Sequence, residues 1–139
     1  MKKFQFRLQK VLEYREQMEE EAKLAFAERR SERLRLEAER HGLQERIVDR
    51  LKSDASGLSG RLALELEVGK MDLAIHHIET QIEVVMVEEA QLREHWLAAR
   101  QEAETMRRLR ESARIEWQTE ADRKEQADLD EWAVQRRTA

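Results

Sequence analysis

The chain has 139 residues, of which 40% are charged and 40% apolar, with four glycines and neither proline nor cysteine. A globular domain of this length would carry turn residues throughout, so the composition favours long helices. The 26 basic and 30 acidic residues are interspersed, which leaves no cationic surface for nucleic acid, and the lack of cysteine excludes disulfides and thiolate zinc sites.

Two kinds of hydrophobic segment are missing from the sequence. It has no run of about 18 apolar residues that could span a bilayer, and the start Met1-Lys2-Lys3-Phe4 lacks the apolar stretch of a secretory signal. We therefore expect a soluble, cytoplasmic protein.

The first expected helix covers about residues 2–53. Its apolar seam is weak, because Arg15, Arg29, Glu32 and Glu39 interrupt it, and it shifts by one residue near its end, like a stutter. The apolar positions assigned to this seam are Leu8, Val11, Met18, Ala22, Ala25, Leu36 and Leu43, followed after the shift by Ile47 and Leu51.

A hinge is expected at about residues 54–60. Gly57 and Gly60, with nearby serines at 53, 56 and 59, form the only cluster of helix-breaking residues in the chain. A single hinge predicts two helices that fold back on each other.

The second expected helix covers about residues 61–136 and carries the strongest pattern in the sequence. From Leu64 to Trp117, apolar residues recur at alternating steps of four and three, with Glu89 and Arg110 as the polar exceptions. Such a repeat stays against a partner helix when the two form a left-handed supercoil. The stripe consists of Leu64, Val68, Met71, Ile75, Ile78, Ile82, Val85, Glu89, Leu92, Trp96, Ala99, Ala103, Met106, Arg110, Ala113 and Trp117.

These elements predict an all-α fold, a long antiparallel two-helix coiled-coil hairpin that forms one domain over residues 1–139. Facing residues should have numbers that sum to about 115, so Leu36 should lie near Ile78. The second helix should then extend roughly 30 residues past the start of the first, or roughly 50 Å at 1.5 Å per residue.

The pattern holds no catalytic, cofactor or metal site. Two helices alone enclose no cavity in which a pKa could be shifted for catalysis, so we expect neither an enzyme nor a small-molecule substrate. His76 and His77 are adjacent and point about 100° apart on a helix, which argues against a shared metal ion. Trp117 and Trp132 in the overhang suggest a contact with a protein partner, whereas Phe4 and its neighbours could equally pack onto the second helix.

Both ends of the sequence resemble the FliJ family of flagellar export proteins. The motif Phe4-x-Phe6-x-Leu8-x-x-Val11-Leu12-x-Tyr14-Arg15-Glu16 is similar to the family's opening, and Leu129-Asp130-Glu131-Trp132-Ala133 to its ending. The resemblance covers essentially the whole chain. It implies a cytoplasmic stalk-like component of the flagellar type III export apparatus, associated peripherally with the inner membrane, that inserts into a hexameric export ATPase.

The resemblance also implies contact residues and further partners. The ATPase contact would involve Phe4, Phe6, Leu8, Arg15, Asp130, Glu131 and Trp132, and contact with the export-gate membrane protein would involve Met71, Ala74 and Ile78. Export chaperones are further candidate partners. Two alternatives are the equivalent stalk of a virulence secretion system and a structural coiled coil that self-associates through Trp117 and Trp132.

Overall fold

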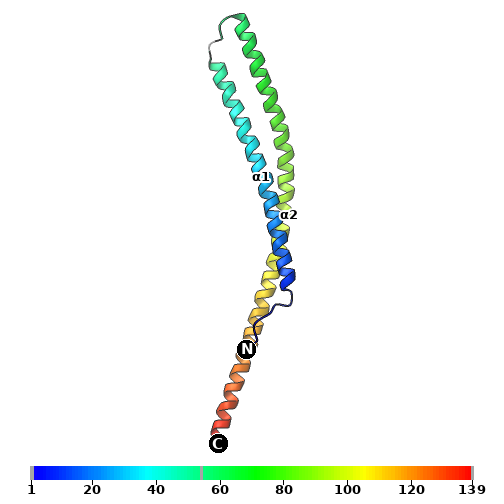
Figure 1. Cartoon of the computed structure of the whole chain (residues 1–139), viewed down its shortest axis with the longest axis vertical. Helices are drawn as coiled ribbons and strands as arrows, with labels where there is room; N and C mark the ends of the chain where they lie inside the picture. Colours follow the sequence, from blue (N-terminus) through cyan, green and yellow to red (C-terminus); the bar gives the residue numbers. More distant parts are fainter. Residues whose placement is uncertain (1, 54, 139) are drawn as a thin grey trace. The chain divides into compact units, whose positions relative to one another are not determined.

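A computed structural model describes residues 2–53 and 55–138 and contains two α-helices in that range. Helix α1 spans Gln9–Lys52 and helix α2 spans Gly57–Thr138 (Figure 1). The helices pack antiparallel, and α2 is the longer, with 82 residues against 44. The predicted all-α hairpin is therefore confirmed.

The contacts divide the chain into two compact units. Unit 1 combines residues up to Glu20 with residues from Leu97 onward, and unit 2 runs from Glu21 to Trp96. Each unit contains a segment of both helices. The expected single domain over residues 1–139 stays a prediction.

The first helix begins at Gln9, so the expected start near residue 2 is wrong. Residues 2–6 are outside any helix or turn, and their side chains alternate: Phe4 and Phe6 are half-buried, whereas Gln5 and Arg7 are exposed. That period of two is typical of an extended strand-like segment and not of a helix. The backbone N–H of Gln9 donates to the carbonyl oxygen of Phe6 at 3.1 Å, and this turn leads into α1.

The hinge is shorter than the expected range of 54–60, because α2 already begins at Gly57 and not near residue 61. Gly57 has a φ of 83°, a left-handed conformation that side chains with a Cβ rarely adopt. At the other end of the turn, the Ser53 hydroxyl donates to the carbonyl oxygen of Arg50 at 2.6 Å and satisfies a terminal acceptor of α1.

The apolar stripe of α2 faces α1 as predicted. Every assigned position from Leu64 to Trp117 is buried or half-buried. In unit 2 the core joins Leu36 of α1 to Ile78, Ile82 and Val85 of α2, so the expected proximity of Leu36 and Ile78 is confirmed. Burial of these side chains is the main stabilising contribution in unit 2.

The seam of α1 is more regular than expected, and the predicted stutter is wrong. Leu12 is buried, whereas Val11 and Leu51 are exposed. The discrepancy arises because charged residues such as Arg33 occupy seam positions, where a hydrophobicity pattern does not detect them. The buried and half-buried residues at unbroken steps of four and three are Leu8, Leu12, Arg15, Glu19, Ala22, Phe26, Arg29, Arg33, Leu36, Arg40, Leu43 and Ile47.

Candidate functional site

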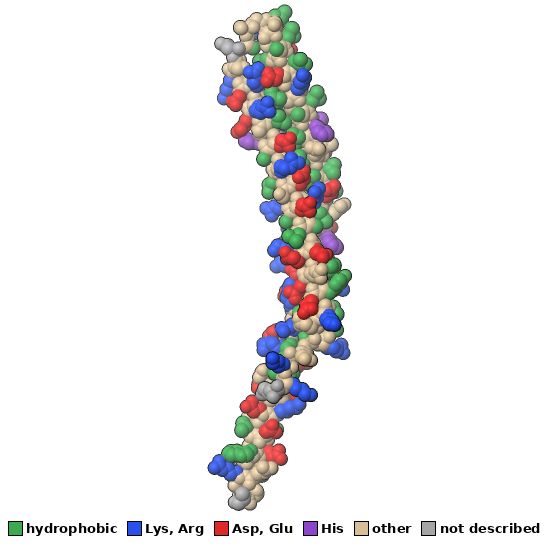
Figure 2. Space-filling model, in the orientation of Figure 1, with side chains coloured by type: hydrophobic (Ala, Val, Ile, Leu, Met, Phe, Trp, Pro, Cys, Tyr) green, Lys and Arg blue, Asp and Glu red, His purple; other side chains and the backbone are tan. Residues whose placement is uncertain are grey.

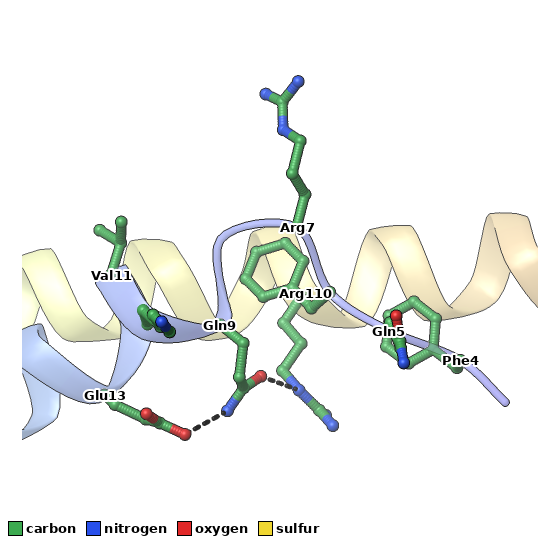
Figure 3. Close-up of a pocket in the computed structure, with 9 residues that line it drawn as sticks. Phe4, Gln5, Arg7, Gln9, Val11, Glu13 and Arg110 are labelled. Carbon is green, nitrogen blue, oxygen red and sulfur yellow. Dashed lines mark hydrogen bonds between the residues drawn. The ribbon is translucent and has the colours of Figure 1, made fainter.

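The N-terminal segment of unit 1 lies on α2. The rings of Phe4 and Trp117 have centroids 6.0 Å apart at an interplanar angle of 53°, and the Arg110 guanidinium lies 5.6 Å from the centroid of the Phe4 ring. Arg110 Nε also donates to Gln9 Oε1 at 3.1 Å, and Gln9 Nε2 donates to Glu13 at 3.4 Å (Figure 3). The packing of the N-terminal aromatics onto the second helix is therefore confirmed for Phe4.

An open pocket of about 580 Å³ lies where the segment turns into α1. Arg7 and Lys10 line it and form no ion pair within the described residues, and Arg7 points away from α2 in Figure 3. Phe4 and Phe6 form its apolar part. The arrangement suits contact with an acidic protein surface better than it suits catalysis, since the pocket is open to solvent.

Arg15 is engaged within unit 1. Its Nη1 donates to Glu102 Oε2 of α2 at 2.6 Å, and both side chains are substantially exposed. Arg107 makes a corresponding bond to Glu19 of α1, which raises the pKa of the guanidinium. Exposed ion pairs of this kind each stabilise a protein by about 0–1 kcal/mol. For Arg15 to bind a partner's carboxylate, it would have to give up its bond to Glu102.

Residues 122–138, here called the tail, are exposed along their whole length. Trp132 is 57% exposed, and the Arg136 guanidinium lies 5.0 Å from the centroid of its ring. Asp130 accepts a hydrogen bond from Gln126 at 3.0 Å one turn away, and Glu131 is exposed. Because Phe4 packs on Trp117, the two terminal motifs do not meet through Phe4 and Trp132.

The residues assigned to the export gate differ in accessibility. Met71 and Ile78 are only 8% and 5% exposed and belong to the apolar stripe that faces α1. Ala74 is exposed. Of the three, only Ala74 is available to a partner while the helices of unit 2 stay paired.

A second apolar stripe on α2 in unit 2 was not predicted from the sequence. Leu62, Leu66 and Leu73 follow one another at steps of four and seven and are all more than half exposed. The spacing is visible in the sequence, but the stronger stripe from Leu64 masks it, since the two stripes occupy the same stretch of one helix.

Metal sites and membrane-spanning helices are absent from the described part of the chain. Within residues 2–53 and 55–138, no three His, Asp or Glu side chains cluster in a way that could bind a metal. His41, for example, lies 3.1 Å from Glu45 on its own helix. Among the helices of the described chain, none has an apolar stretch sufficient to cross a membrane.

Comparison with known families gives one result. The model of the family described as "Flagellar FliJ protein" matches residues 4–138. Neither a curated protein nor a solved structure matches the chain. The family match covers nearly the entire sequence, including both terminal motifs. The chain therefore belongs to the flagellar FliJ family, whose members are non-enzymatic components of the flagellar export apparatus.

Proposed function

We propose that this protein is the stalk of the flagellar export ATPase, with its tail inserted in the ATPase ring. The exposure of the tail on every side of the helix is the observation that carries this proposal. A lone helix without packing partners is only marginally stable in water. A ring that surrounds the tail would bury it on all sides at once.

The apolar side chains of the tail also suit an enclosing partner. Leu129 and Trp132 lie on one side of the helix, and Val134 lies on the other, since residues five apart differ by about 140°. All three are more than half exposed. Trp132 is the strongest candidate anchor, because tryptophans dominate the binding energy of many protein interfaces.

The N-terminal segment of unit 1 also supports the proposed contact with the ATPase. Phe4 packs on Trp117 of α2 and Phe6 is half-buried, whereas Arg7 and Lys10 form no ion pair within the described residues. Phe4, Phe6 and Leu8 would therefore act as positioning residues. Asp130, Glu131 and Trp132 would make the direct contacts with the ATPase.

The test is binding of the full chain to the purified export ATPase, measured together with ATP hydrolysis. Trp132→Ala should weaken binding at least tenfold and reduce stimulation of hydrolysis, with helicity by circular dichroism unchanged. Leu34→Ala, at an exposed leucine of α1, is the matched control and should bind like the wild type. Unchanged binding by Trp132→Ala would refute the insertion of the tail.

A second contact, with the export-gate membrane protein, would link the ATPase to the gate and hold the chain at the inner membrane from the cytoplasmic side. Ala74 supports it, as an exposed small residue on α2. Ala74→Glu should weaken binding to the gate's soluble domain, whereas Ala90→Glu, at an exposed alanine on another side of α2, should not. Equal binding by both variants would exclude Ala74 from the contact.

A further inference from the structure

The second apolar stripe of unit 2 lies opposite the side of α2 that packs on α1. At 100° per residue, Leu62, Leu66 and Leu73 fall within about 40° of one another, whereas Ile75 and Ile82 of the buried stripe point roughly 140–180° away from them. Figure 2 shows hydrophobic side chains recurring along the edge of unit 2 that α2 forms. We call this surface the outer stripe; its members, each more than half exposed, are Leu58, Leu62, Leu66, Leu73, Val84 and Val87.

The outer stripe has the spacing of a helix-packing surface. Single exposed leucines are ordinary, but an aligned set along about eight helical turns marks an interaction site. Leu62, Leu66, Gly69 and Leu73 follow steps of four, three and four, which is the spacing of a coiled-coil seam. A Cβ added at Gly69 would meet no described atom within 4 Å, so a partner's backbone could come close there.

A row of carboxylates runs along one flank of the outer stripe. Glu65, Asp72 and Glu79 are seven residues apart and therefore aligned. Within the described residues, none of the three forms an ion pair or hydrogen bond.

The acidic residues on the other side of α2 behave differently. Glu67 lies 2.7 Å from Arg50, and Glu88 lies 3.3 Å from Arg29, so both are paired with α1. The outer row has no such partner, although it belongs to the same helix. Its charges are available to an external cation.

The cations near the outer stripe are few. Arg61 lies one turn before Glu65 on the acidic flank, and Lys70 and His77 lie on the opposite flank, with His76 at the edge of the stripe. None of these side chains forms an ion pair within the described residues. The surface thus has an apolar centre, one acidic flank and one weakly basic flank.

We propose that the outer stripe binds an amphipathic α-helix of a partner protein, which packs beside α2 as a third helix. The partner helix carries an apolar heptad face and a row of Lys or Arg that meets Glu65, Asp72 and Glu79. Opposite charges beside a heptad seam select the partner and its orientation. This contact uses residues of unit 2, whereas the tail belongs to unit 1, so the proposal is independent of the insertion into the ATPase.

A second copy of the chain fits this surface poorly. In an antiparallel pair of outer stripes, the acidic rows of the two copies would face each other. In a parallel pair, the heptad would set Glu83 against Glu83 in the seam. Like charges in such positions oppose association, so a basic helix is the better occupant.

Two synthetic helical peptides of about 28 residues test the proposal on the full chain. They share a leucine face and differ in one flank, which is lysine in the first peptide and glutamate in the second. By fluorescence anisotropy, the lysine peptide should bind at least tenfold more tightly, and the preference should shrink as salt screens the charges. Equal binding of both peptides would overturn the proposal.

Variants locate the binding to the outer stripe. Leu66→Ser with Leu73→Ser should weaken binding of the lysine peptide at least tenfold, whereas Leu24→Ser with Leu34→Ser, at exposed leucines of α1, should leave it unchanged. Changing Glu65, Asp72 and Glu79 to Lys should reverse the peptide preference. Helicity should be retained in all three variants, because every changed side chain is exposed or half-buried.

Self-association is the competing outcome. Sedimentation of the wild-type chain at increasing concentration should show a monomer. A dimer that disappears in the Leu66→Ser, Leu73→Ser variant would assign the outer stripe to a second copy and overturn the proposal. Because residues 122–138 are unchanged in these variants, either result leaves the test of ATPase binding independent.

Discussion

Arg33 of α1 donates two hydrogen bonds to the carboxylate of Glu89 in α2, from Nε to Oε2 and from Nη2 to Oε1. Both residues occupy seam positions, where an apolar side chain is usual, and both are largely covered, with side chains 22% and 14% exposed. Arg33 also bonds to Glu37, 3.1 Å away on its own helix. A covered polar pair in a heptad seam is a known means of fixing the register between helices.

Arg33→Ala should lower the free energy of unfolding by about 1–3 kcal/mol, because it leaves the covered Glu89 carboxylate without its main partner. Urea denaturation followed by circular dichroism measures the change. Arg35→Ala is a suitable control: Arg35 pairs with Glu32 on its own exposed surface, and the loss of such a pair changes stability little. Equal effects of the two substitutions would contradict a special role for the seam pair.

Replacing both Arg33 and Glu89 by Leu should give a different result. The apolar pair should keep or raise stability, since it removes the desolvation of two charges. The register should become less defined, because leucines accept several alignments. Spin labels at positions 36 and 78 should then report a broader distance distribution than in the wild type, and an unchanged distribution would mean that the apolar contacts alone fix the register.

Stability should fall in acid partly through the same pair. The hydrogen bonds from Arg33 hold the pKa of Glu89 below its ordinary value of 4.5. The stabilisation is therefore complete above pH 4.5 and is lost as the pH falls through the lowered pKa of the folded state. Urea midpoints at pH 7, 5 and 3 should show this loss, and Glu89→Gln should show a smaller drop between pH 5 and pH 3. An equal drop in the variant would assign the acid sensitivity to other carboxylates.

The sequence predicted α2 well because its stripe is apolar almost throughout. Hydrophobic periodicity reports which side of a helix is buried only when the buried residues are hydrophobic. In α1 the seam includes Arg15, Glu19 and Arg33, whose burial depends on charges of the other helix. Such pairing is a property of the folded hairpin and is not visible in a hydrophobic pattern. The pattern of α1 therefore suggested a stutter that the helix does not have.

The N-terminal segment and the tail of α2 were predicted with unequal success. The alternation of Phe4 and Phe6 was visible, but a start near residue 2 ignored its period of two, which is incompatible with a helix. Packing of the N-terminal aromatics onto the second helix was one of the two expectations for this segment, and the contact between Phe4 and Trp117 confirms it for Phe4. Exposure of Trp132 agrees with the expectation that the second helix overhangs, because the tail lacks a packing partner among the described residues.

Ala103 gives a direct test of close packing in unit 1, because it is 0% exposed. Ala103→Leu should destabilise the protein by about 1–3 kcal/mol, since the larger side chain must displace its neighbours. Ala98→Leu places the same side chain at an exposed position of α2 and should change stability by less than about 0.5 kcal/mol. Thermal unfolding of both variants provides the comparison, and tolerance of Leu at position 103 would show that the helices can separate there.

Trp96 combines a favourable and an unfavourable contact in unit 2. Its ring stacks on Phe26, with centroids 5.6 Å apart and an interplanar angle of 17°, but its buried Nε1 has no hydrogen-bond partner within the described residues. Trp96→Ala should lose the stack and the buried area, at a cost of about 3–5 kcal/mol. Trp96→Phe should cost far less, because it keeps an aromatic ring against Phe26 and removes a buried donor that lacks an acceptor. Urea denaturation distinguishes the two variants: if Trp96→Phe were as destabilising as Trp96→Ala, the indole N–H would have to be satisfied in solution, by a water molecule or by a rotated side chain.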